Sequence, residues 1–208
     1  MTYANRPDAA EEVVSAITAR EGHALALRAD LGEVADVIQA FDDAEAALGS
    51  LDVVVICGAV GRLTRIIDTE PDDFDAVFAV NARGAFFALR EAARRVRDGG
   101  RIIALSTAGT ALQVTDLALY LGSKGAVEQF VRVLARELGH RNITVNVLSP
   151  GPTDTELLPD RDRDISPGLS PFDRLGTSSD VAKVIGFLAG PDAGWLTGQN
   201  VRATGGVV

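Results

Sequence analysis

Short apolar runs alternate with longer amphipathic stretches along most of the chain, and this alternation constrains the fold more than any other feature. Each run is followed by Gly, Asp or Pro, and all but the last are apolar on both faces, as in strands buried between two helical layers. The runs occupy residues 23–29, 51–59, 100–107, 143–150 and 200–204, and the amphipathic stretches occupy 8–21, 33–48, 72–97, 117–139 and 179–189. This order predicts an α/β fold in which helices cover both faces of a parallel sheet.

Composition narrows the classes of protein and of partner. With 208 residues, 47% of them hydrophobic, the chain predicts one domain over 1–208 with a sizeable core. Its 20 Lys and Arg against 29 Asp and Glu, with no long basic run, argue against a nucleic-acid partner. The start lacks a secretory signal, no apolar run reaches the length of a membrane span, and the single Cys57 allows no internal disulfide. We expect a cytoplasmic protein without a membrane partner.

The stretch "YLGSK" places Tyr120 and Lys124 four residues apart in the amphipathic segment 117–139. Any Tyr and Lys at this spacing meet on a helix, and such a pair alone is more often a solvated surface. Thr107, however, ends the run 100–107, 13 residues before Tyr120. Because parallel strands end at the same edge of a sheet, where ligands bind, a hydroxyl, a phenol and an ammonium can converge there.

Five segments in the same order resemble the short-chain dehydrogenase/reductase family, and the resemblance covers nearly the whole chain. The family signature is Tyr-x-x-x-Lys, with a Ser 13 residues before the Tyr and an Asn on the preceding helix. The matching segments are "FAVNARGAFF" around Asn81, "GRIIALST" ending at Thr107, "YLGSKGAVEQF", "NITVNVLSPGPTDT" and "GWLTGQNVRATGG". The resemblance implies a three-layer αβα, Rossmann-like, doubly wound parallel sheet. It also implies hydride transfer between NADP(H) and a small-molecule carbonyl or secondary alcohol.

The resemblance gives four residues catalytic roles. Tyr120 would donate the proton to the substrate oxygen, and the ammonium of Lys124 would lower the pKa of the phenol and hold the ribose hydroxyls. Asn81 would support a water that links Lys124 to solvent. Thr107 would hydrogen-bond the substrate oxygen, although the family has Ser here and the neighbouring Ser106 is the alternative. We expect Ser106 to point into the sheet.

Residues expected to contact the cofactor lie at several strand ends. Pro150 and Gly151 would wrap the nicotinamide, with Thr153 near its carboxamide or the pyrophosphate, and Tyr120 and Lys124 would also contact the cofactor. Asp30 and Leu31 would lie near the adenine, although Asp30 could instead be the N-cap of the next helix. Cys57 and Gly58 stand where the family usually has "NNAG", so that only backbone contacts to the adenosine are expected to survive.

The end of the family's second strand corresponds to Asn5 and Arg6. An acidic residue at this position would bind the ribose 2′-OH, whereas Arg6 can pair with a 2′-phosphate. We therefore expect NADP, with NAD as the alternative. An exposed Arg before a Pro-initiated helix is an equally good explanation of Arg6. No cluster with the spacing of metal ligands is present, and no metal is expected.

The family's first strand and its Gly-rich pyrophosphate turn have no counterpart in residues 1–208. Either these residues belong to a longer product, or the remaining strands close the gap and dinucleotide affinity suffers. A non-catalytic family member that serves as a subunit or interaction partner is the alternative function.

Two further expectations concern surfaces. The segment 152–177, rich in Pro and Gly, reads as a loop or lid over the substrate. The helix 117–139 carries more apolar side chains than one sheet contact should cover, and family members commonly pair through it. We therefore expect a homodimer or homotetramer. The apolar positions are Leu117, Leu121, Val127, Val131, Leu134 and Leu138.

Overall fold

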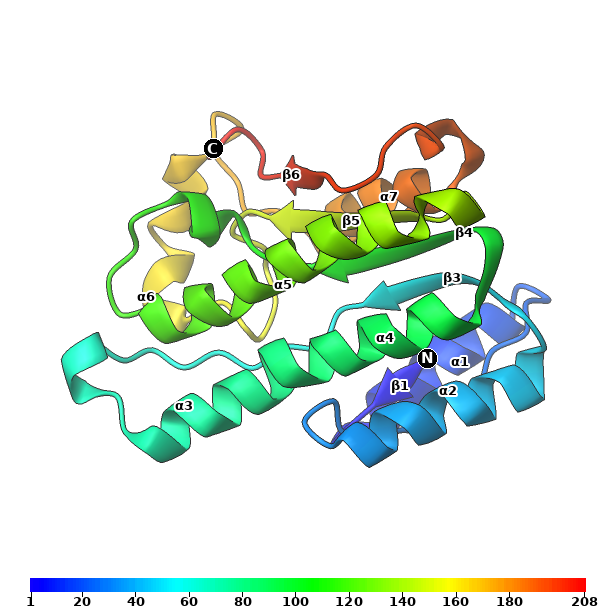
Figure 1. Cartoon of the computed structure of the whole chain (residues 1–208). Coiled ribbons are helices and arrows are strands. Elements are labelled where there is room, and N and C mark those ends of the chain that lie inside the picture. Colours follow the sequence, from blue (N-terminus) through cyan, green and yellow to red (C-terminus); the bar gives the residue numbers. More distant parts are fainter.

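A computed structural model describes all residues from Met1 to Val208 and contains only parallel strand pairs (Figure 1). The main sheet has four strands in the order β3-β4-β5-β6. Their bounds are β3 Leu51–Ile56, β4 Val96–Leu105, β5 Thr144–Pro150 and β6 Asn200–Ala203. Two short strands, β1 Thr2–Tyr3 and β2 Leu27–Arg28, form a second parallel pair of their own. Buried β-branched residues fill both faces of β4 and β5, as expected for strands between two helical layers.

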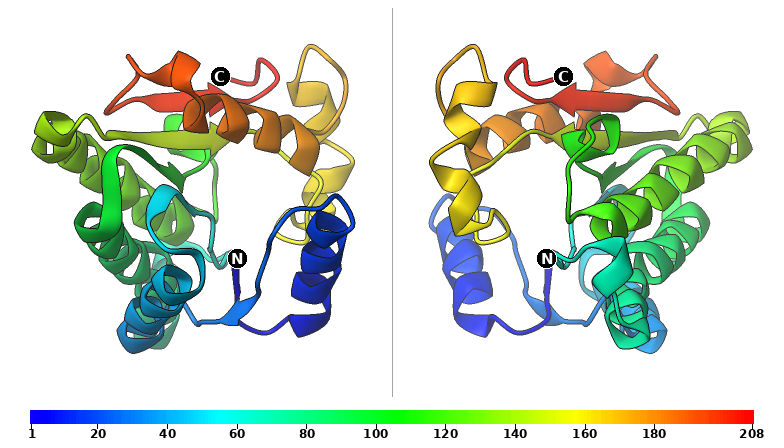
Figure 2. Two further views of the ribbon diagram at one scale, coloured as in Figure 1. Left: turned by 90° about the vertical axis from the view of Figure 1, so that its right-hand side faces the viewer. Right: turned by 90° about the vertical axis from the view of Figure 1, so that its left-hand side faces the viewer.

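Helices cover both faces of the strands, so the predicted three-layer α/β architecture is confirmed (Figure 2). One layer contains α2 (Val34–Leu48), α4 (Ala85–Arg95) and α5 (Ala118–Leu138). The opposite layer contains α1 (Pro7–Thr18) and α7 (Ser178–Ala189). The larger apolar core lies between the main sheet and the first layer, and a smaller one lies under α7. Short 3₁₀ turns occupy Ile66–Asp68, Ala108–Ala111, Gly139–Arg141, Ser166–Leu169 and Pro191–Ala193.

The stretch predicted as one helix over 72–97 is divided into three parts. It contains α3 (Pro71–Phe78), a π-helical turn (Ala79–Gly84) and α4, after which β4 begins at Val96. The π turn lies where neighbouring segments come closest, because an added Cβ at Gly84 would overlap the carbonyl oxygen of Leu31. π-Helical turns are frequent at functional sites. This break therefore directs attention to Asn81, which lies inside it.

Helix starts show the chemistry that favours helix N-termini, with one correction to the sequence analysis. Helix α3 begins at Pro71 with two Asp residues in its first turn. The N-cap of α7 is Thr177, whose hydroxyl and the carboxylate of Asp180 form a capping box. Asp30 is not the N-cap of α2, because that position is Glu33. Its carboxylate instead accepts a hydrogen bond of 2.8 Å from the backbone of Gly32.

The two sheets do not join, so the remaining strands have not closed the expected gap. β3 pairs only with β4, and β1 pairs only with β2. The N-terminal pair is held to the rest mainly through α2, which packs on α4. Arg95 of α4 donates hydrogen bonds to Asp42 and Glu45 of α2 at 2.6 and 2.8 Å.

The segment 152–177 is less irregular than predicted. It contains the short helix α6 (Asp160–Arg163) and one of the 3₁₀ turns. A bridge between Thr153 and Gly176 closes its base. The hydroxyl of Ser170 donates a hydrogen bond of 2.6 Å to the carbonyl of Gly205. No helix of the protein combines the length and apolarity that crossing a lipid bilayer requires.

Candidate active site

The carboxyl ends of β3, β4 and β5 meet the first half of α5 at one edge of the main sheet. Cys57 follows β3 and Thr107 follows β4, while Tyr120 and Lys124 lie on α5. The charge of Lys124 is close enough to the thiol of Cys57 to influence its pKa, which burial raises and the ammonium lowers in part. This edge is where parallel α/β folds bind ligands.

Lys124 is the buried charge of this site. Its side chain is 3% exposed, and its ammonium donates a hydrogen bond of 3.0 Å to the carbonyl oxygen of Leu105 at the end of β4. Burial lowers the pKa of Lys124 to about 8, and interaction with Cys57 offsets a small part of this effect. The ammonium is thus held at the sheet edge in a setting that favours loss of its proton.

The structure gives Tyr120 a different electrostatic setting from the expected one. Burial raises the pKa of its phenol, and no opposing effect of Lys124 accompanies this rise. The reason is visible in the hydrogen bonds, because the ammonium of Lys124 is directed to the carbonyl of Leu105. In this state the phenol is therefore a proton-bearing group, which is the form that a proton donor requires.

Asn81 is fully buried, and protein groups engage its whole side-chain amide. Its two amide hydrogens are donated to the carbonyl of Val60 and the hydroxyl of Ser123, at 2.8 and 3.0 Å. Its amide oxygen accepts a 2.8 Å hydrogen bond from the backbone of Val60. Ser123 in turn donates to the carbonyl of Tyr120 at 2.7 Å. The side chain of Asn81 thus connects the loop after β3 with the start of α5.

Thr107 and Ser106 point to different partners. Ser106 is buried, and its hydroxyl donates a hydrogen bond of 2.7 Å to Glu128 of α5. Thr107 is half-buried, and its hydroxyl oxygen accepts a hydrogen bond of 3.2 Å from the backbone of Gly109. The hydroxyl hydrogen of Thr107 remains available to a ligand.

The remaining expected cofactor residues fall into two groups. Leu31 lies against Gly58, where an added Cβ would stand 2.9 Å from the leucine side chain. Gly151 passes so close to β6 that a Cβ would lie 2.8 Å from the carbonyl of Thr204. Next to it, the hydroxyl of Thr153 donates to the carbonyl of Gly151 at 2.9 Å. At both places a side chain in place of the glycine would overlap a neighbouring residue.

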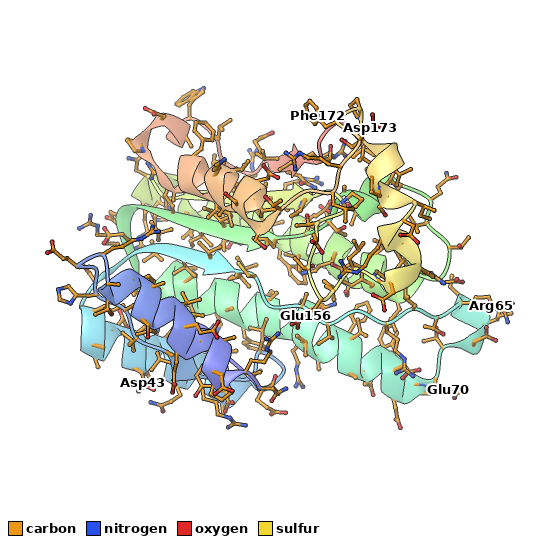
Figure 3. The ribbon with its side chains drawn as sticks, turned by 180° about the vertical axis from the view of Figure 1, so that it is seen from behind. Asp43, Arg65, Glu70, Glu156, Phe172 and Asp173 are labelled. Carbon is orange, nitrogen blue, oxygen red and sulfur yellow. The ribbon has the colours of Figure 1, made fainter.

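Asn5 and Arg6 are both exposed at the start of α1. The guanidinium of Arg6 forms an ion pair with Glu156 of the segment 152–177. Figure 3 shows Glu156 well separated from Phe172, which lies toward the other end of the same segment. Because of its ion pair with Glu156, Arg6 already has an anionic partner, which a 2′-phosphate would have to displace.

Ser123, Thr110 and Glu128 contribute to this edge of the sheet although the sequence did not single them out. Ser123 lies within "YLGSK", and its position one residue before Lys124 was the only available signal. No group of three or more His, Cys, Asp or Glu side chains is arranged to hold a metal ion.

Comparisons with known proteins agree with this architecture. A family model described as "Enoyl-(Acyl carrier protein) reductase" matches residues 1–208. Elsinochrome reductase 1 of Elsinoe fawcettii is 40% identical over 96% of this chain and 80% of its own length. Versicolorin reductase of Emericella nidulans is 38% identical over 99% of this chain and 84% of its own length.

Solved structures give the same result. A short-chain dehydrogenase/reductase from Serratia marcescens superimposes with a TM-score of 0.94 at 40% identity, covering 99% of this chain and 85% of its own. The landomycin C-6 ketoreductase LanV, solved with NADP and rabelomycin, has a TM-score of 0.91 at 35% identity and covers 99% and 84%. Fold and relatives together define an oxidoreductase of the α/β class. The chain belongs to the short-chain dehydrogenase/reductase family.

Proposed function

We propose that this protein reduces the carbonyl group of fused-ring aromatic compounds with NADPH, with Tyr120 as the proton donor. The observation that carries the proposal is the placement of Tyr120 and Lys124 on α5 beside the end of β4, at the ligand-binding edge of the sheet. The substrate class follows from its relatives, whose names refer to elsinochrome, versicolorin, tetrahydroxynaphthalene and angucyclines. All of these compounds have fused rings.

The residues of the site support separate parts of this reaction. NADPH supplies the hydride when it is bound. Tyr120, whose burial favours the protonated phenol, donates a proton to the oxygen on which negative charge develops. The free hydroxyl hydrogen of Thr107 stabilises the same oxygen. Lys124 holds positive charge nearby, and the network of Asn81 and Ser123 fixes the start of α5.

The residues expected to contact the cofactor offer different chemical groups to its two halves. Pro150, Gly151 and Thr153 offer main chain and a hydroxyl to the nicotinamide half, and Leu31 with Gly58 forms an apolar surface for the adenosine half. A 2′-phosphate would take Arg6 from Glu156, an exchange between exposed groups that costs little. Separate titrations of the protein with NADPH and with NADH measure the preference for the 2′-phosphate, and we expect NADPH to bind more tightly.

The segment 152–177 supports the proposed substrate class. It exposes large apolar side chains, among them Ile165 at 65%, Leu169 at 55% and Phe172 at 69%. Flat aromatic ligands would cover such surface favourably. We expect the bicyclic ketone 2-tetralone to be reduced with a higher kcat/KM than the acyclic 2-butanone, in NADPH-oxidation assays. Equal values would contradict the fused-ring preference.

The decisive test of the reaction is Tyr120→Phe, which removes only the phenolic hydroxyl. We expect the rate of 2-tetralone reduction at saturating NADPH to fall at least 100-fold, as the loss of a general acid predicts. NADPH binding, measured by fluorescence titration, should change by less than about threefold. The control is Tyr3→Phe, which changes a tyrosine outside this site. Turnover within a few fold of the unsubstituted protein would exclude Tyr120 as the donor.

We also propose that the protein forms a homodimer or homotetramer through α4 and α5. The apolar surface available is smaller than the sequence predicted, because Val127, Val131 and Leu138 are buried in this chain's own core. Phe86 and Val133 remain exposed on these helices. Light scattering should give two or four times 21.8 kDa. A mass equal to one chain would contradict pairing.

A further inference from the structure

A single carboxylate on α5 holds both sides of the turn that contains Thr107. Glu128 accepts a hydrogen bond of 2.7 Å from the hydroxyl of Ser106 and another of 2.7 Å from the hydroxyl of Thr110. Both bonds end on the same carboxylate oxygen. We propose that Glu128 is a positioning residue that fixes Thr107 relative to Tyr120 and Lys124, an inference that rests on the function proposed above.

The two hydroxyls enclose the backbone that presents Thr107. Ser106 directly precedes it and is also held to β5, because its backbone donates to the carbonyl of Leu148 at 2.9 Å. Thr110 follows three residues later, and its hydroxyl also lies 2.9 Å from the carbonyl oxygen of Thr107. Glu128 and this carbonyl therefore share one hydroxyl hydrogen. The carboxylate thereby acts on the backbone of Thr107 through one intermediate side chain.

Tyr120, Lys124 and Glu128 follow one another along α5 at intervals of about one helical turn. The same helix therefore carries the proposed donor, the ammonium and the carboxylate. Lys124 makes its own tie to this strand end, through the carbonyl of Leu105. When Lys124 holds the ribose hydroxyls of the cofactor, as the family resemblance implies, Glu128 keeps α5 and the turn after β4 in register independently of the ammonium.

Hydrogen bonds to an ionised carboxylate are stronger than those to a neutral acceptor. Glu128→Gln keeps an acceptor oxygen of the same reach, whereas Glu128→Ala removes the acceptor. We expect Glu128→Ala to lower kcat for 2-tetralone at least 10-fold with the KM for NADPH changed less than twofold. Glu128→Gln should recover kcat to within about threefold of the unsubstituted protein. The matched control is Glu137→Ala, an exposed residue of the same helix, which should change neither constant.

Hydrogen–deuterium exchange tests the positioning directly, whether or not the protein turns over a substrate. Backbone amides of Gly109, Thr110 and Leu112 are hydrogen-bonded within the turn. Glu128→Ala should raise their exchange rates several-fold and leave β5 unchanged, and Glu128→Gln should not. If exchange of the turn is unaltered, or if β5 loosens equally, Glu128 does not position this turn and the proposal fails.

The two readouts separate this inference from the proposed function. Absence of turnover in the unsubstituted protein contradicts the proposed function, and the exchange data then decide the role of Glu128. Active unsubstituted protein with an equally active Glu128→Ala variant overturns the positioning role alone. A parallel loss of kcat, NADPH binding and melting temperature in Glu128→Ala would also overturn it, because that pattern indicates general unfolding.

Discussion

Lys124 shows how burial sets the chemistry of one residue. A lysine that is 3% exposed and bonded to one carbonyl lacks the solvation its charge needs, so its pKa falls from 10.5 to about 8. The protonated form that the proposed mechanism requires is therefore destabilised in the folded protein without ligand. A bound dinucleotide, which is anionic, would favour that form again. Binding of the dinucleotide and binding of a proton at Lys124 should therefore each favour the other.

The same pKa predicts how stability depends on pH. Above pH 8 the unfolded chain keeps a proton on Lys124 that the folded chain loses, so the free energy of unfolding rises with pH. The rise between about pH 7.5 and pH 9 should be roughly 1 kcal/mol. The raised pKa of Cys57 opposes this rise from the upper end of the window, and the raised pKa of Tyr120 opposes it above the window. Urea unfolding measures the effect.

The substitution Lys124→Met provides the control for this pH dependence. It keeps an unbranched side chain and removes the ionisable group, so the rise between about pH 7.5 and pH 9 should disappear. The variant should also be more stable than the unsubstituted protein near pH 7, because it no longer buries a charge. An unchanged pH dependence would show that other groups cause it.

At the scale of elements, the sequence predicts what periodicity determines and misses what distant contacts determine. The expected helices 33–48, 117–139 and 179–189 agree closely with α2, α5 and α7, because each has a continuous apolar stripe. The π turn inside 72–97 was not predicted. It depends on the hydrogen bonds of Asn81 to Val60 and on the approach of Leu31 to Gly84, both of which are long-range.

The candidate site divides in the same way. That Tyr120 and Lys124 share one face of a helix near the end of β4 follows from spacing and strand order. The partner of Lys124 does not, because a lysine in a sequence carries no sign of which carbonyl it will meet. Glu128 looked like one of many charges on an amphipathic helix. Its function becomes visible only when the hydroxyls of Ser106 and Thr110 are placed against it.

The contact between α2 and α4 gives a prediction at the scale of elements. Arg95 is 17% exposed and joins Asp42 and Glu45 of α2 to Glu91, which is 3% exposed. Arg95→Met keeps the aliphatic stem but leaves Glu91 with less compensation. We expect the free energy of unfolding, measured in urea, to fall by on the order of 3 kcal/mol.

Arg94 supplies the matched control for Arg95. It contacts the same Glu91 at 3.4 Å, but its side chain is 63% exposed. Exposed ion pairs contribute little to stability, so Arg94→Met should lower the free energy of unfolding by less than about 1 kcal/mol. If the free energy of unfolding falls equally in the two variants, the contact between α2 and α4 does not depend on Arg95.

At the scale of the whole molecule, the arrangement of strands leaves one edge of the main sheet without a partner. β3 pairs with β4 on one side, while β1 and β2 form a separate pair. Val53 and Val55 of β3 are 39% and 37% exposed, whereas Ile56 packs in the main core. An unpaired edge with exposed apolar residues is a template for pairing with another chain.

The last prediction follows from this edge and concerns association of residues 1–208 in solution. At micromolar concentration we expect the homodimers or homotetramers to associate slowly into larger aggregates through this edge, and Val53→Lys to slow this growth several-fold in light-scattering assays. A lysine at a position that is 39% exposed reaches water without entering the core, and it opposes pairing along the strand. The formal charge of −9 falls in magnitude with this substitution, which by itself would favour association. Val114→Lys, at a 41% exposed position outside the strands, changes the charge equally and should not slow growth. If both variants behave alike, the edge of β3 is not the surface through which the chains associate.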